Sequence, residues 1–243
     1  AVAAGAAWEL RGAAEIFGGQ LRLTRAGAPA LSPTTVNYED KLQAVAEDDP
    51  RRPTTRHGAG SATLSLPRGS HRLFLEVAFR LVVGGGTGGL GFSLSYGGGI
   101  PLTGAVGERG AGLGLRLQFL TAGFGPTVRV VYDGVVLGEV ARPTLRNGVL
   151  TAVRLRVGRD GLTLSHGDDD LFSPPLAVPG WAPQPEWQVV FAAAAAELTD
   201  NHWVDDLHVR TGAYVERTPA AVHVALNGQQ FGPMAAAPFE YVP

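Results

Sequence analysis

The sequence lacks cysteine altogether, and this absence removes several kinds of chemistry from its 243 residues. A chain without thiols forms no disulfide, holds no metal through thiolates and has no cysteine nucleophile. The cellular compartment stays open, because large secreted β-domains can fold without disulfides. A chain of this length buries roughly 70% of its unfolded surface, so its core needs no covalent support.

Excess charge and long apolar runs are also missing. The 20 basic and 22 acidic residues nearly cancel, so no net field favours nucleic acid or an anionic membrane. No apolar run approaches the roughly 18 residues of a membrane span, and the first residues do not resemble a signal peptide. We expect no nucleic-acid partner and no direct membrane insertion by this segment, which we interpret as a mature or excised part of a longer chain.

The sequence does contain frequent glycine and proline between short β-prone runs. Its 34 glycines and 17 prolines separate segments rich in β-branched and aromatic residues, which is typical of many strands joined by tight turns. Alternation is clearest in Leu73 to Val83, where Glu76 and Arg80 lie opposite the apolar residues. The predicted strands are Gln20 to Thr24, Ala62 to Leu66, Leu73 to Val83, Gly91 to Tyr96, Gly114 to Leu120, Val128 to Tyr132, Val135 to Val140, Leu150 to Val157, Gly161 to His166 and Trp187 to Ala192.

Two Asp-Gly pairs predict hairpins between these strands. Asp133-Gly134 and Asp160-Gly161 each lie between β-prone runs, and Asp-Gly readily adopts the positive φ angles of a two-residue hairpin turn. The stretch from Asn37 to His57 is charged, contains proline and is poor in β-formers. It therefore predicts a surface loop.

The most distinctive stretch runs from Trp187 to Val209. Apolar residues alternate from Trp187 to Phe191, and a second apolar set spans Val204 to Val209 after an acidic Asn-His-Trp turn. Two strands that each hide one face predict a sandwich of two sheets.

A change of pattern after Gly212 predicts a domain boundary, with a β-sandwich in residues 1–212 and an extension in residues 213–243. Apolar residues alternate after Ala221, Asn227-Gly228 forms a turn, and alternation resumes before Val242, which predicts a hairpin or a strand pair. The extension resembles the closing strands of an IPT/TIG or filamin-type immunoglobulin-like module. Two strands alone have too little apolar face for a complete module.

Four blocks between Ala7 and Gly212 resemble the concanavalin A-like superfamily of L-type lectins and laminin-G-like modules. They are Trp8-Glu9-Leu10 with the following Gly18 to Thr24, FRLVVGGGTGGLGFSLSYGGG, GERGAGLGLRLQFLT and EWQVVFAAAAAELTDNHWVDDLHV. The resemblance implies an all-β jelly-roll sandwich of two antiparallel sheets. Any ligand is then expected at loops over the concave sheet.

Three positions depart from this family. L-type lectins carry an Asp-Gly in the loop where this chain has Gly89-Leu90-Gly91, and that aspartate contacts sugar hydroxyls near the metal. An acidic residue of a Phe-Asp-Thr-like strand is here Leu120, and related modules have Arg-Thr-Gly in place of Ala194 to Ala196. Because calcium needs six to eight oxygen ligands, we expect no family-type metal site and no cofactor.

The candidate ligand-binding residues are Asp200, Asn201, His202 and Trp203. An aromatic face packs against a sugar ring and an imidazole can donate to a hydroxyl, so His202 and Trp203 suit a glycan. The structural alternative is a turn closed by Asp200 and Asn201, with Trp203 inserted in the core. The other oxygen-rich cluster, Asp168-Asp169-Asp170, predicts a solvated hairpin loop.

The residues predict a non-enzymatic function. A glucanase of this fold would carry two carboxylates about 5 Å apart in one cleft, and no Glu-x-Asp-x-x-Glu run occurs. We predict a lectin-like structural or adhesion module of an extracellular or cell-surface assembly, which contacts other protein subunits or domains through loops or sheet edges. Glycans are the alternative partner, through a non-standard lectin site. A glycoside hydrolase relative and an intracellular scaffold are the remaining hypotheses.

Overall fold

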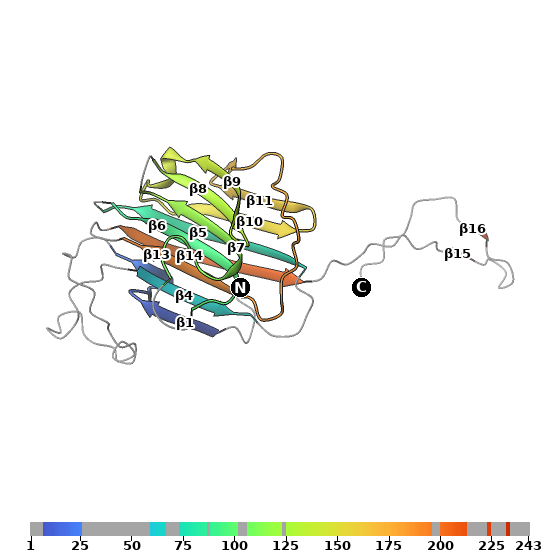
Figure 1. The fold of residues 1–243 in the computed structure, drawn as a ribbon, viewed down its shortest axis with the longest axis horizontal. Coiled ribbons are helices and arrows are strands. Elements are labelled where there is room, and N and C mark those ends of the chain that lie inside the picture. The colour runs from blue at the N-terminus through green and yellow to red at the C-terminus, as the bar shows by residue number, and fades with distance from the viewer. Residues whose placement is uncertain are drawn as a thin grey trace. The chain divides into compact units, whose positions relative to one another are not determined.

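The computed structural model describes residues 7–25, 59–66, 73–86, 88–101, 106–122, 125–195 and 200–212, together with short strands at 223–224 and 232–233. The chain divides into two compact units, Ala1–Gly212 and Ala213–Pro243. The first unit is a sandwich of two antiparallel sheets (Figure 1).

The first sheet has seven strands in the order β1-β4-β13-β6-β7-β8-β9. Every neighbouring pair is antiparallel. The strands are β1 (Ala7–Gly12), β4 (Ala59–Ser65), β13 (Gln188–Ala194), β6 (Gly91–Gly98), β7 (Leu113–Leu120), β8 (Thr127–Tyr132) and β9 (Val135–Ala141).

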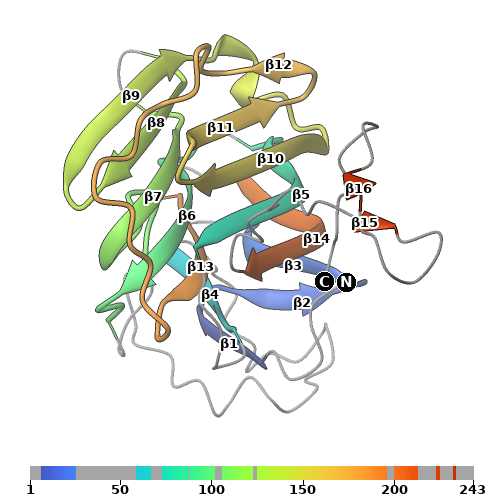
Figure 2. The same ribbon diagram turned by 90° about the vertical axis from the view of Figure 1, so that its right-hand side faces the viewer.

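The second sheet also has seven strands, in the order β12-β11-β10-β5-β14-β3-β2, which Figure 2 shows from one side. They are β12 (Asp169–Asp170), β11 (Gly161–His166), β10 (Thr151–Gly158), β5 (Phe74–Gly84), β14 (Asn201–Gly212), β3 (Gln20–Thr24) and β2 (Glu15–Phe17). A 3-10 turn, η2 (Pro143–Leu145), precedes β10. Among the described residues, no helix has the length and apolar character needed to cross a membrane.

The predicted all-β jelly-roll sandwich is confirmed. All ten predicted strands are present, with ends shifted by a few residues at most. The stretch from Trp187 to Val209 supplies β13 to the first sheet and β14 to the second, as expected for two segments that each hide one face. The short strands β1, β2 and β12 were not predicted, because each depends on pairing with a distant or neighbouring strand rather than on its own pattern.

Both predicted hairpins are present, although one turn is shifted by a residue. Asp133 and Gly134 have φ angles of 45° and 85° and link the paired residues Tyr132 and Val135. In the other hairpin Gly161 is already paired with Gly158. The turn there is therefore Arg159-Asp160, and not Asp160-Gly161.

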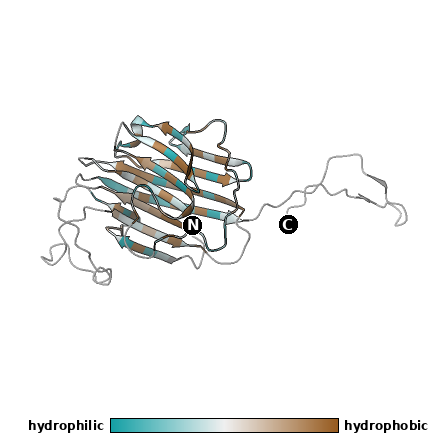
Figure 3. Cartoon of the chain, in the orientation of Figure 1, coloured by the Kyte–Doolittle hydropathy of each residue, from teal (hydrophilic) through white to brown (hydrophobic). Residues whose placement is uncertain are grey.

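The core lies between the two sheets, and strands of alternating hydropathy enclose it (Figure 3). Phe191 is fully buried at its centre. The centroid of its ring lies 5.5 Å from that of Phe79, 6.2 Å from that of Phe92 and 6.1 Å from that of Trp8. These rings join strands of both sheets, so the packing of this cluster fixes how the sheets face each other.

The second unit contains one described strand pair. β15 (His223–Val224) pairs antiparallel with β16 (Gly232–Pro233). The hairpin or strand pair expected between Ala221 and Val242 stays a prediction, because most of that range lies outside the described residues. Its relation to an immunoglobulin-like module stays a prediction. The predicted loop from Asn37 to His57 lies outside the described residues.

Candidate functional site

Three segments adjoin one another at one end of the first sheet, and they are the segments that depart from the lectin pattern. The main-chain nitrogen of Leu90 donates to the oxygen of Ala194 over 2.9 Å, and that of Thr121 donates to the oxygen of Leu90 over 3.1 Å. The Thr121 hydroxyl donates to Gly89 O over 2.8 Å. Because Leu90, Leu120 and Ala194 carry only hydrocarbon side chains, this junction offers no carboxylate from any of its three departing positions.

The backbone packs tightly on both sides of Leu90, and only glycine fits at position 91. Gly91 has a φ of +137°, and a Cβ there would lie 2.2 Å from the main-chain oxygen of Phe119. A Cβ on Gly89 would lie 3.0 Å from Asp200 Cβ and 3.1 Å from His202 Cε1. The Gly89-Leu90-Gly91 loop therefore packs directly on the first residues of the predicted ligand site.

Asp200 is fully buried and holds three chain segments together. Its carboxylate accepts a hydrogen bond from Arg146 Nε over 2.8 Å and from the main-chain nitrogen of Gly86 over 3.0 Å. The side chain of Arg146 is 31% exposed, so one end of this ion pair still reaches water. The carboxylate is engaged in linking loops and is not presented to solvent.

His202 is also fully buried, in contact with Thr24. The Thr24 hydroxyl donates to the main-chain oxygen of Asp200 over 2.8 Å and lies 2.6 Å from His202 Nδ1. Since the hydroxyl has a single proton, its oxygen accepts from Nδ1–H, which fixes the tautomer of the ring. His202 Nε2 is buried without a hydrogen-bond partner among the described residues.

Burial lowers the pKa of His202 from its ordinary 6.5 to about 4. The Asp200 carboxylate acts in the opposite direction, and the Arg146 guanidinium lowers the pKa further. Desolvation is the largest cause, because a charged imidazole would lose its water shell at this position. His202 is therefore neutral near pH 7.

The depressed pKa predicts a loss of stability in mild acid. Below pH 6.5 the unfolded chain binds a proton at residue 202, whereas the folded chain does not until the pH approaches 4. The unfolded state then binds more protons, so stability falls as the pH is lowered through this window, by on the order of 2 kcal/mol at pH 4.5. Urea unfolding at pH 7.0 and at pH 4.5 measures this difference.

His202→Gln is the matched control for this pH dependence. The variant should lose most of the difference between pH 7.0 and pH 4.5. Burial also lowers the pKa of His166, so the variant should keep a smaller loss of stability in acid that comes from His166. An unchanged pH profile in His202→Gln would show that residue 202 is not the titrating group.

Asn201 and Trp203 lie apart from the buried pair. Asn201 is half-buried beside Gly85, whose Cβ, if present, would lie 2.9 Å from Asn201 Nδ2. Trp203 pairs with Arg22 of β3, and the Arg22 guanidinium carbon lies 4.7 Å from its ring centroid and 4.1 Å from that of Phe17. Trp203 is half-buried in this stack and not inserted in the core. The four candidate residues therefore do not converge on one accessible surface.

The outer face of the first sheet is covered by residues 106–111. Ser93 Oγ donates to Gly107 O over 2.8 Å, and Gln118 Nε2 donates to Arg109 O over 2.8 Å. Hydroxyls from two further outward positions accept hydrogen bonds from the main chain of the same segment: Ser61 from Val106 and Ser95 from Ala111. The small polar side chains of this sheet face are thus buried beneath a strap and do not form an open ligand surface.

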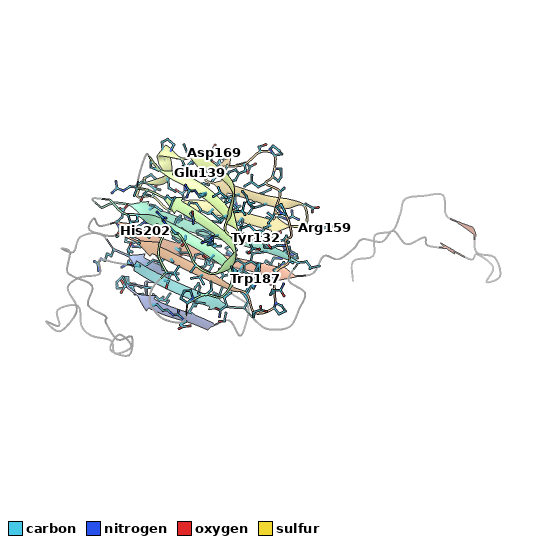
Figure 4. All side chains as sticks on the ribbon, viewed as in Figure 1. Tyr132, Glu139, Arg159, Asp169, Trp187 and His202 are labelled. Carbon is cyan, nitrogen blue, oxygen red and sulfur yellow. The ribbon has the colours of Figure 1, made fainter. Side chains whose placement is uncertain are left out.

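The acidic residues of the described ranges do not assemble a metal site. No three His, Asp or Glu side chains in these ranges lie close enough together to hold a metal ion. Of the predicted loop Asp168-Asp169-Asp170, only Asp168 lies in the turn after β11, because Asp169 and Asp170 form β12. Arg142 donates to Asp169 over 2.6 Å. In Figure 4, Asp169 and His202 lie at separate places on the sandwich.

Three elements of this region were not predicted. Arg146 and Thr24 complete the Asp200 and His202 cluster, but they are 54 and 176 residues away from Asp200 in sequence, and no local pattern marks them. The strap was also missed. Its closely spaced glycines, Gly107 and Gly110, are the local signal, since they suit a segment that lies close against another backbone.

Comparison with solved structures shows the fold. The exoplasmic/lumenal domain of VIP36, in its Ca2+/Man3GlcNAc-bound form, matches with a TM-score of 0.55 and 16% identity over 87% of each chain. The carbohydrate recognition domain of Emp47p matches with a TM-score of 0.54 and 13% identity, over 85% of this chain and 89% of that one. Both are L-type lectins of the concanavalin A-like fold. Neither a family profile nor a curated protein matches the sequence.

Proposed function

Because the chain has the concanavalin A-like lectin fold, we propose that it is a non-enzymatic, lectin-like structural or adhesion module of an extracellular or cell-surface assembly. It acts through protein–protein contacts and not through a metal-dependent sugar pocket. The observation that carries this proposal is the junction of Leu90, Leu120 and Ala194. In an L-type lectin these segments bring oxygen ligands together. In this chain they bring together hydrocarbon side chains.

The buried cluster gives independent support. Asp200 and His202 are fully buried, and their polar atoms bind Arg146, Gly86 and Thr24. A carboxylate with these partners would have to break an ion pair before it reached a ligand, which is costly for a buried group. We therefore propose that both residues have a structural role.

An exposed aromatic group at a sheet edge suits a protein contact. Phe17 of the edge strand β2 is 51% exposed and Ile16 beside it is 52% exposed. The Phe17 ring stacks on Arg22, which in turn stacks on Trp203. Aromatic residues and arginine contribute most of the binding energy in many protein interfaces, so this edge is our candidate contact surface.

Calcium provides the sharpest test of the proposal. A calcium site filled at a thousand times its Kd would stabilise the folded state by about 4 kcal/mol. We expect no such effect: thermal unfolding in millimolar calcium and in EDTA should give the same Tm within about 1 °C.

A glycan array in the presence and absence of chelator completes the test. Binding to neutral glycans that EDTA abolishes would contradict the proposal. It would favour the second candidate, a lectin with a non-standard site, for which the glycan-bound form of VIP36 is the supporting observation.

A further inference from the structure

A groove crosses the outer face of the second sheet, opposite to the face that packs on the core. It has a volume of about 570 Å³ and spans β11, β10, β5 and β14, the strands at the centre of Figure 2. Its charged lining residues are Glu76, Arg154, Arg156, Asp170 and Arg210, and His208 also lines it. We call it the arginine groove. None of the segments that depart from the lectin pattern contributes to it.

Strand register places two of the arginines beside Glu76 and the third beside a small residue, Ala78. Glu76 of β5 is paired with Arg156 of β10 on one side and with Arg210 of β14 on the other. In the next outward row Ala78 lies between Arg154 and His208. Neighbouring strands are about 4.8 Å apart and alternate residues on a strand about 7 Å apart, so the three guanidinium groups border one depression whose floor is Ala78.

The charges of the arginine groove are not balanced. Arg156 and Arg210 share the single carboxylate of Glu76, at 3.5 Å and 3.3 Å, and their side chains are 68% and 78% exposed. Arg154 has no acidic partner within the described part of the chain. The lining thus holds three arginines and two carboxylates, Glu76 and Asp170, while the carboxylate of Asp206 contacts His208. Guanidinium groups bind carboxylate and sulfate oxygens through paired hydrogen bonds.

The remaining lining suits a saccharide better than a peptide. Thr163 and Ser165 of β11 add hydroxyls beside Arg156 and Arg154. The apolar residues of the lining, Val77, Leu155 and Val209, are buried or half-buried and point toward the core. A peptide partner would normally place aromatic or aliphatic anchors in apolar pockets, and the arginine groove offers donors instead.

We propose that the arginine groove binds an acidic saccharide through its sulfate or carboxylate groups, with one anionic group above Ala78 between Arg154, Arg156 and Arg210. This binding needs no metal, uses none of the junction segments and goes beyond the proposed assembly function. Because the arginines are exposed, the attraction is screened by salt. Affinity should fall by about an order of magnitude between 50 mM and 300 mM NaCl.

The test measures the Kd of a heparin-derived tetrasaccharide and of trigalacturonate at 50 mM NaCl, with neutral maltotriose as the reference ligand. Arg154→Ser combined with Arg210→Ser should weaken binding of the better acidic probe at least about tenfold. Glu76→Gln should act in the opposite direction, because it removes the like charge at the centre of the groove, and should strengthen binding about threefold. A gain of affinity does not arise from misfolding.

Arg109→Ser is the matched control. Its side chain is 83% exposed and forms an ion pair with Glu108, on the strap over the other sheet. The variant loses the same kind of charge and should keep its Kd within about twofold, since surface charges beyond a Debye length are largely screened.

Two results would overturn the assignment. The first is no binding of either acidic saccharide, or binding that the groove substitutions leave unchanged. The second is tighter binding of a poly-glutamate peptide than of both saccharides, which would make the occupant a protein segment. A different outcome is binding of neutral glycans that is chelator-sensitive and that the groove substitutions do not change. That result would contradict the proposed assembly function but not the assignment of the arginine groove.

Discussion

Replacing Asp200 with alanine is expected to destabilise the sandwich by about 2 to 4 kcal/mol. Removing one partner of a buried ion pair leaves the other without compensation, and the partial exposure of Arg146 reduces the cost. The main-chain nitrogen of Gly86 also loses its acceptor, which adds the penalty of an unsatisfied donor. Urea unfolding at pH 7, followed by near-UV circular dichroism, measures the change.

Two further variants separate charge from position. Asp200→Asn keeps an acceptor for Gly86 and should cost less, about 1 to 2 kcal/mol. Asp168→Ala removes an exposed carboxylate from a hairpin turn and should change stability by no more than about 0.5 kcal/mol. If Asp200→Ala retained full stability and lost glycan binding, Asp200 would be a ligand residue and our structural assignment would be wrong.

Replacing Phe191 with alanine should have the largest effect, a loss of about 3 to 5 kcal/mol in the free energy of unfolding. The side chain is fully buried and touches aromatic rings of both sheets, with Phe79 edge-on at 5.5 Å. Its removal leaves a cavity between the two sheets, and the sheets cannot move together to fill it. Equilibrium unfolding in guanidinium chloride measures the loss.

Phe17→Ala is the matched control for the core substitution. The same ring is removed from a side chain that is 51% exposed, so the cost should stay below about 1 kcal/mol. Equal losses in the two variants would mean that the aromatic cluster around Phe191 does not hold the sheets together.

Strands such as β5 were predictable because they hide one face and therefore carry their own pattern. Leu73 to Val83 alternates along its length, and the structure places β5 at Phe74–Gly84. The turn at Asp133-Gly134 was predictable for the same local reason: both residues adopt positive φ angles, which Asp and Gly tolerate. The middle of β14 did not follow simple alternation, because a bulge between Asp205 and His208 shifts the register.

The site and the arginine groove depend on neighbours that sequence does not reveal. Arg154 and Arg156 alternate visibly on one strand. Arg210 lies near them because β10 and β14 are the two neighbours of β5 in the sheet, which the sequence does not reveal. In the same way, Asp200 could be singled out as a turn residue, but its partner Arg146 comes from a loop in another part of the chain. Long-range pairing decides both cases.

The junction at Leu90 has a consequence for how freely its residues can change. The hydrogen bonds of Leu90 use its main-chain nitrogen and oxygen, so these bonds do not depend on which side chain stands at the position. Gly89 and Gly91 lack that freedom, since a methyl group on either would meet its neighbours at 3.0 Å or less. The backbone path of this corner is therefore set by its two glycines and its main-chain hydrogen bonds, and not by the side chain at position 90.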